Sequence, residues 1–206
     1  IPKLNRNASR EAANQILTHI RYTQHLAMQD DKYENFVSDN PVRWFRMRWG
    51  IAFNNTSLYD ECLIDKPGIK TWKYNVFFDN SFKGNINSES EVANDIYKSG
   101  KLLSGGWSGM STDACKKINK ELNLGKRFGI TSVDFKDGCS GMQTINFDEM
   151  GRPMKVVSVT KNRGAKRPYD RLLKKDCSIT ITDKRGNQTT ITIEKESGFA
   201  SIKENS

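Results

Sequence analysis

Four cysteines are the residues with the clearest chemistry in this 206-residue chain. They are widely spaced, and none belongs to a CxxC pair; they are Cys62, Cys115, Cys139 and Cys177. A zinc finger needs paired ligands a few residues apart, so that one local loop can wrap the ion, and this sequence has no such pair. The even number therefore predicts two disulfides and an oxidising compartment. Four buried free thiols in a cytosolic protein are the alternative.

The histidines and the paired carboxylates do not form a catalytic or metal-binding pattern. His19 and His25 lie on one predicted helix, at positions about 120° apart around its axis, so they cannot clamp one ion together. A cysteine nucleophile would have to take one of them as its base. Two aspartate pairs lack the ligand spacing of a calcium loop and suit turns or helix caps; they are Asp30 with Asp31 and Asp134 with Asp137. We therefore expect no enzyme activity, no metal and no cofactor.

A basic segment carries the strongest charge feature. Residues 161–175 contain seven basic residues against one acidic residue, Asp170. Basic residues with an interleaved aromatic ring can follow phosphates and stack a base, and the alternative is an ordinary solvated loop. The candidate contacts to an anion or nucleic acid are Lys161, Arg163, Lys166, Arg167, Tyr169, Arg171, Lys174 and Lys175. Three arginines would extend the patch if the fold brings them near, namely Arg43, Arg46 and Arg48.

The composition indicates one polar globular domain. The net charge is +9, the aromatic content is 10% and the mean hydropathy is −0.69. The charge allows an anionic partner without identifying one. No stretch approaches the roughly 18 apolar residues that would span a bilayer. Strand alternation places Trp49 and Trp72 in the core and leaves Trp44 and Trp107 as candidates for exposure.

Hydrophobic periodicity predicts one helix followed by strands. Apolar residues recur at three- and four-residue steps over 8–28, which indicates an amphipathic helix. Alternation indicates half-buried strands over 42–53 and 72–78, with Arg46 and Arg48 pointing outward. Residues 80–112 are rich in Gly, Ser and Asn, which predicts a long variable connection with at most one short helix, at 89–98. The other predicted elements are a helix at 111–125 and strands at 129–135, 144–147, 154–160, 177–182 and 189–193.

This order of elements predicts an α+β fold, in which the amino-terminal amphipathic helix lays its apolar stripe on an antiparallel β-sheet. We expect a single domain over 1–206, with a helix region at 1–36, a sheet-containing head at 42–206 and a variable middle at 80–125. We favour a disulfide between Cys139 and Cys177, which would join the last hairpin to the preceding sheet. Cys62 with Cys115 would then tie the middle to the second strand, and the other two pairings stay open.

Both ends of the chain resemble the type IV pilins and pseudopilins. Ile1-Pro2-Lys3-Leu4 followed by an amphipathic helix is similar to the point where the hydrophobic amino-terminal helix of these proteins leaves the membrane and enters the globular head. Four carboxy-terminal strings resemble the closing strands of minor pseudopilins of the type II secretion kind; they are INFDEMGRP at 145–153, CSITIT at 177–182, ITIE at 191–194 and SGF at 197–199. Residues 54–138 show no such resemblance.

The resemblance implies a pilin-like structural subunit of a periplasmic or cell-surface filament in secretion, pilus biogenesis or DNA uptake. It further implies a membrane helix upstream of this chain, cleavage by a prepilin peptidase, methylation and a location on the periplasmic side of the bacterial inner membrane. Its partners would be other pilin or pseudopilin subunits, the inner membrane and, in an uptake system, DNA. The alternative function is a nucleic-acid-binding module that uses residues 161–175, and salt-dependent DNA affinity would separate the two.

Overall fold

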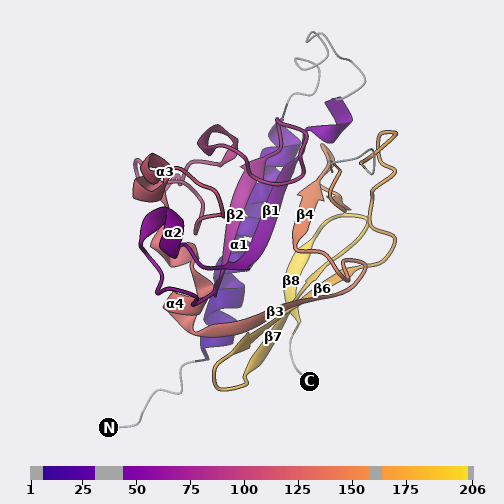
Figure 1. Cartoon of the computed structure of the whole chain (residues 1–206). Coiled ribbons are helices and arrows are strands. Elements are labelled where there is room, and N and C mark those ends of the chain that lie inside the picture. Colours follow the sequence, from indigo (N-terminus) through magenta and orange to yellow (C-terminus); the bar gives the residue numbers. More distant parts are fainter. Residues whose placement is uncertain (1–6, 31–43, 158–163, 204–206) are drawn as a thin grey trace.

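The computed structural model describes residues 7–30, 44–157 and 164–203 (Figure 1). Some expectations fall outside these ranges, namely those for residues 1–4, Asp31, Arg43, Lys161 and Arg163. The described part is α+β, with one long helix and two antiparallel β-sheets. The predicted class is therefore confirmed.

The long helix α1, Ala8–Gln29, lies where the periodicity predicts it. It begins after Asn7, whose side chain accepts a hydrogen bond from the backbone N–H of Arg10 and so satisfies one free donor of the first turn. The centre of its apolar stripe is fully buried, at Ala12, Ala13, Ile16 and Ile20. The helix contacts strands of both sheets, so this stripe lies at the centre of the main core.

The strands form two four-stranded sheets instead of the single sheet predicted. The first has the order β2-β1-β4-β5 and consists of β1 (Trp49–Thr56), β2 (Thr71–Phe78), β4 (Thr144–Phe147) and β5 (Pro153–Met154). The second has the order β3-β6-β7-β8 and consists of β3 (Ile130–Asp137), β6 (Cys177–Asp183), β7 (Gln188–Ile193) and β8 (Ala200–Lys203). Figure 1 shows α1 in indigo behind β1 and β2, with the yellow strands of the second sheet at its side. The split arises because β4 pairs with β1, whereas β3 pairs with β6.

The strand predicted from residue 42 begins only at Trp49. Residues Trp44–Arg46 form a 3-10 helix, η2, which is closed by a hydrogen bond from Met47 N to Trp44 O at 3.1 Å. Arg48, predicted to point outward, is fully buried. Alternation assigned it to the solvent side. Its burial could not be foreseen, because the carboxylate that pairs with it, that of Glu149, lies far away in the sequence.

Strand β2 is buried on both faces, although alternation predicts one buried face. The middle of the chain pairs with the free edge of β2, where Val76 N donates to Leu103 O at 3.0 Å, and its apolar side chains cover the second face at Phe77. This middle forms its own apolar cluster, composed of Leu58, Phe77, Ile86, Val92, Leu102, Trp107, Met110, Ala114 and Ile118. Trp107, a candidate for exposure, is only 6% exposed. The Gly- and Ser-rich segment is thus a packed layer.

Residues 59–128 contain several short helices, where the sequence predicted two between 89 and 125. They are α2 (Tyr59–Cys62), η3 (Glu89–Glu91), α3 (Thr112–Lys117), η4 (Lys120–Leu122) and α4 (Leu124–Phe128). Ser111 caps α3, but the helix stops at Ile118 because Asn119 N instead donates to Ser104 O. Gly129, in the left-handed conformation with φ 67°, ends α4, so the predicted stop at Gly125 is wrong.

Two disulfides join distant segments in the pairing favoured from the sequence. Cys62 and Cys115 connect α2 to α3, and Cys139 and Cys177 connect the turn after β3 to the first residue of β6. The Cα–Cα distances are 5.5 and 5.0 Å. The first bond lies in the middle layer, and the second joins β3 to the closing hairpin.

Candidate functional site

A groove of about 980 Å³ lies between the turn after β3 and the segment 164–175. We call it the basic groove, because five cations and two carboxylates line it, namely Lys155, Lys166, Arg171, Lys174, Lys175, Asp137 and Asp170. Gly138, Gly164 and Leu172 complete the lining. Four of the residues that the sequence analysis named as candidate anion contacts therefore line the groove, namely Lys166, Arg171, Lys174 and Lys175. Arg167 and Tyr169 do not line it.

Backbone hydrogen bonds hold the segment 164–175 beside β5. The bonds run from Ala165 N to Val157 O at 2.7 Å, from Lys155 N to Arg171 O at 2.8 Å and from Leu173 N to Pro153 O at 3.0 Å. Ala165 and Leu173 are buried, whereas Lys166, Lys174 and Lys175 are exposed. The described part of the charge run is therefore attached at both ends, with its lysines facing solvent.

The opposite wall of the basic groove is joined to the segment through Gly138. Gly138 N donates to Asp176 O at 2.8 Å, and a Cβ at residue 138 would lie 2.0 Å from the carbonyl oxygen of Lys175. The adjacent Cys139–Cys177 disulfide joins the same two strands covalently. The backbones of the two walls therefore approach closely only because residue 138 has no side chain.

The lysines of the groove are not neutralised within the part of the chain that the structure describes. No ion pair between described residues involves Lys155, Lys166, Lys174 or Lys175. Asp170 Oδ2 instead accepts hydrogen bonds from the backbone N–H groups of Lys166 and Arg167, at 2.9 and 3.3 Å. The carboxylate of Asp170 thus shapes the turn, and the positive charge stays available to a ligand.

Tyr169 faces away from the groove, contrary to the base-stacking expectation. Its hydroxyl donates a short hydrogen bond to Glu149, and the guanidinium carbon of Arg152 lies 5.2 Å from the centre of its ring. Burial tends to raise the pKa of Glu149, but hydrogen bonds from Tyr169 and Arg48 outweigh this and hold that pKa below its usual value. The ring is therefore a packing element beneath Arg152.

Arg46 and Arg48, two of the arginines expected to extend the patch, lie behind it. Arg46 Nε donates to Ala165 O at 2.8 Å, which helps to position the segment. Arg48 pairs with Glu149 and donates from Nε to Phe45 O at 3.2 Å. Its Nη2 has no acceptor among the described residues. Both guanidinium groups therefore support the basic segment from inside.

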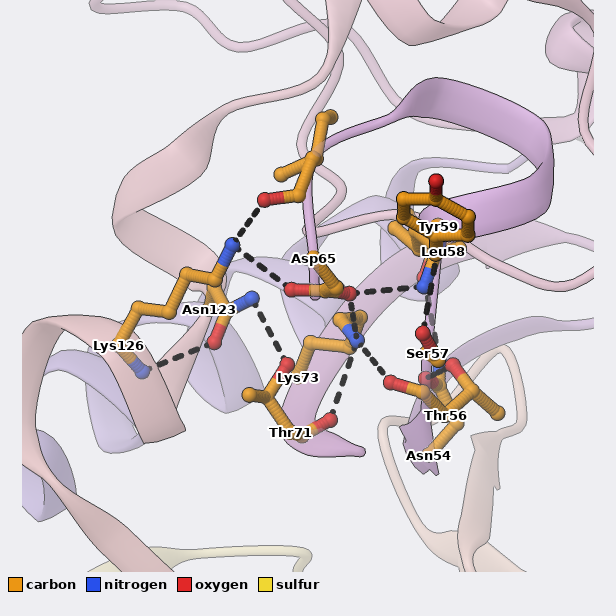
Figure 2. A network of polar contacts seen from close by, with 12 residues as sticks. Asn54, Thr56, Ser57, Leu58, Tyr59, Asp65, Thr71, Lys73, Asn123 and Lys126 are labelled. Carbon is orange, nitrogen blue, oxygen red and sulfur yellow. Dashed lines mark hydrogen bonds and ion pairs between the residues drawn. The ribbon is translucent and has the colours of Figure 1, made fainter. Parts of the chain in front are cut away.

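A second polar centre surrounds Lys73, as Figure 2 shows. Lys73 and Asp65 side chains are fully buried, 3.5 Å apart between Nζ and Oδ2. Lys73 Nζ also donates to the carbonyl oxygens of Thr56 and Thr71, at 2.5 and 3.1 Å. Lys126 pairs with Asp65 Oδ1 at 2.7 Å. Burial lowers the pKa of Lys73, and Asp65 opposes this.

The arrangement around Lys73 suits a structural role better than a catalytic one. The buried ammonium group donates to two backbone carbonyls and pairs with the Asp65 carboxylate, so it is enclosed by protein partners and not exposed to a substrate. In a half-buried strand over 72–78, Lys73 would belong to the solvent face of β2. The middle layer covers that face, which buries the charge together with its partners.

The histidines and aspartates also enter structural contacts. His19 Nδ1 lies 2.6 Å from the hydroxyl of the buried Tyr74, and burial lowers the pKa of this histidine. His25 is exposed on the same helix. Asp134 Oδ2 accepts a hydrogen bond from Ser132 Oγ at 2.7 Å, and Asp137 lines the basic groove. Within residues 7–30, 44–157 and 164–203, no three His, Cys, Asp or Glu side chains form a group that could hold a metal.

Sequence reasoning missed two parts of this site. Lys155 belongs to the groove although it lies outside the charge run, because β5 places it beside Arg171. Gly138 joins the walls, and its position next to Cys139 was the available signal. The Arg48–Glu149–Tyr169 contacts had no local signal.

Comparisons of the chain with protein-family models, curated proteins and solved structures give no match. Of the helices in the described part, none combines the length and apolarity needed to cross a membrane. The function therefore has to be argued from the geometry and from the resemblance at the two ends of the sequence.

Proposed function

We propose that this chain is the globular head of a pseudopilin or minor pilin, a structural subunit of a periplasmic or cell-surface filament. The observation that carries the proposal is α1, a 22-residue helix with a buried stripe in contact with strands of both sheets. A subunit that joins a filament through an amino-terminal helix needs this helix to be firmly attached to its head. The resemblance of the closing strands supports the same assignment.

The outer side of α1 suits contacts between subunits. Exposed residues follow one another at three- or four-residue steps along the helix, which places them in one stripe; they are Arg10, Asn14, Thr18, Arg21 and His25. A polar stripe of this length can pack on a neighbouring helix through hydrogen bonds and ion pairs, and it stays soluble before assembly. The helix is thus attached on one side and accessible on the other.

The disulfides and the polar centres fit a structural subunit better than an enzyme. Two disulfides are typical of proteins that fold in an oxidising compartment such as the periplasm. The buried Lys73 and Arg48 both pair with carboxylates that hold neighbouring segments together. These groups therefore contribute to stability, and the surface remains for binding.

The test begins with the gene. An apolar span of about 20 residues ahead of Ile1, preceded by a short basic leader, is expected. The full-length product should be cleaved and methylated in cells that contain a prepilin peptidase, and a strain without the peptidase is the matched control. An ordinary signal peptide or a soluble start would contradict the proposal.

Assembly is tested separately by cysteine crosslinking along α1. Thr18→Cys on the exposed stripe should give crosslinks between subunits in sheared filaments. Ser108→Cys, on an exposed position of the middle layer, is a control with the same chemistry. If Ser108→Cys gave crosslinks between subunits and Thr18→Cys gave none, the proposed packing of α1 on a neighbouring subunit would be contradicted.

A further inference from the structure

We propose that the basic groove binds the phosphate backbone of nucleic acid without reading its bases. This goes beyond a role in a filament, since a subunit can assemble whether or not it binds such a ligand. The proposal rests on three properties of the groove: an excess of cations over carboxylates, walls joined by a backbone hydrogen bond and a disulfide, and a described lining with no aromatic ring and one large apolar side chain.

The charge of the groove calls for a ligand with several closely spaced anions. Lys155, Lys174 and Lys175 line one groove with Lys166, and none of the four has an ion pair within the described part of the chain. Like charges that line one groove repel one another, and a polyanion relieves that repulsion. Duplex DNA carries one charge per about 1.7 Å of its axis, so several phosphates can enter one groove. Lysine suits such contacts because it acts as a mobile point charge.

The walls of the groove are held in place before any ligand arrives. The bond from Gly138 N to Asp176 O and the Cys139–Cys177 disulfide join one wall to the other. Lys155 N donates to Arg171 O, which holds these two lining residues side by side. A ligand therefore has to order only the lysine side chains, and the cost of ordering the backbone is already met by folding.

The lining argues against the other anionic partners. Among the described residues of the lining, Leu172 is the only large apolar side chain, so an acyl chain or a hydrophobic protein anchor finds little surface to bury there. Tyr169 is turned away to Glu149 and lies under Arg152, so the described lining offers no ring on which a base could stack. Phosphate contacts remain, and they give affinity without sequence preference.

The experiment measures binding of the 206-residue chain to a fluorescent DNA duplex by anisotropy across a salt series. Four lysine contacts predict a slope of about −3.5 for log K against log salt, a loss of about 100-fold in affinity between about 50 and 200 mM. The groove variant Lys166→Gln, Lys174→Gln, Lys175→Gln should have a slope of about −1. A duplex of different sequence and the same length should bind equally well.

A matched control separates the groove from net charge. Lys66→Gln, Lys70→Gln, Lys83→Gln removes the same charge from exposed lysines outside the groove, and its slope should equal that of the parent chain. Tyr169→Leu should also leave the affinity unchanged. The groove lysines are exposed, so the groove variant should melt at the parent temperature, which shows that its defect is one of binding.

Several outcomes would overturn the proposal. Among them are no binding at low salt, an equal loss in the control variant, and a clear preference for one sequence. Tighter binding to vesicles of phosphatidylglycerol or to heparin than to DNA would assign the groove to a lipid surface or an acidic polysaccharide. Each of these results leaves the filament proposal standing, because processing by the prepilin peptidase is measured independently.

Discussion

Gly138 lies against the backbone of Lys175 so closely that a Cβ on residue 138 would stand 2.0 Å from the Lys175 carbonyl oxygen. This contact joins β3 to the segment that leads into β6, at the edge of the basic groove. The two strands are held together there by a backbone hydrogen bond and a disulfide as well. The shape of the groove therefore depends on residue 138 being a glycine, because any side chain there would collide with the backbone of Lys175.

Gly138→Ala should force the two backbones apart. We expect a loss of about 3 kcal/mol in the free energy of unfolding, because backbone atoms cannot move aside as a flexible side chain would. Gly141→Ala is the control: its Cβ meets nothing within 4 Å, so only the left-handed backbone, with φ 73°, costs about 1 kcal/mol. Urea unfolding measures both, and equal losses would show that the contact is not tight.

The two disulfides should separate stability from binding. Replacing either pair by alanines opens a loop of similar length, 53 residues for Cys62–Cys115 and 38 for Cys139–Cys177, so each should cost up to about 4 kcal/mol. Only the Cys139 and Cys177 variant should also weaken DNA binding, because that bond holds the groove walls. Anisotropy at low salt, below the unfolding temperature of both variants, makes the comparison. The same affinity for both would contradict the role of the second disulfide.

The buried network of Figure 2 should respond unequally to the loss of its members. Asp65→Asn leaves the Lys73 ammonium buried without a counter-charge, and we expect a loss of about 3–5 kcal/mol. Lys73→Met should cost less, about 1–3 kcal/mol, because Asp65 keeps Lys126 and the backbone N–H of Leu58. Lys126→Gln, at the solvent edge, should cost under about 1 kcal/mol. Chemical denaturation gives the order, and a larger loss for Lys73→Met than for Asp65→Asn would contradict it.

Glu149 should make stability depend on pH in the acidic range. Its pKa is lower in the folded chain than the ordinary value of 4.5, so its contribution is fully present above that pH and is lost as the pH falls through the folded-state pKa. Glu149→Gln removes this dependence and leaves Arg48 buried without a charge partner. Tyr169→Phe is a milder control that deletes one hydrogen bond. Thermal melts across the acidic range test this, and an unchanged pH profile in Glu149→Gln would refute it.

The sequence predicted those parts of the fold whose signal is local. Helix α1 and the β6–β7 hairpin follow from periods that their own residues display, since each element buries one face. The burial of strand β2 was harder to predict, because the middle of the chain covers the face that alternation assigns to solvent. Arg48 was predicted to point outward and is buried, because its charge is paired with a carboxylate 101 residues away in the sequence.

The positive charge of the candidate site could be predicted from the sequence, but the set of residues that line the groove could not. The basic residues of 161–175 follow one another in the sequence, whereas Lys155 is brought beside them only by its backbone hydrogen bond to Arg171. Tyr169 has the right residue type for stacking, yet Glu149 and Arg152 hold it on the other side. Its orientation is decided by tertiary contacts that leave no pattern near residue 169.

The position of α1 across both sheets has a mechanical consequence. A pull on the amino-terminal end of this helix acts along its axis, while its buried stripe contacts strands of both sheets. Such a load must shear many side-chain contacts at once, whereas a pull on an edge strand such as β8 would break its pairing with β7 one bond after another. The fold should thus resist tension applied at the amino-terminal end of α1 better than tension applied at β8.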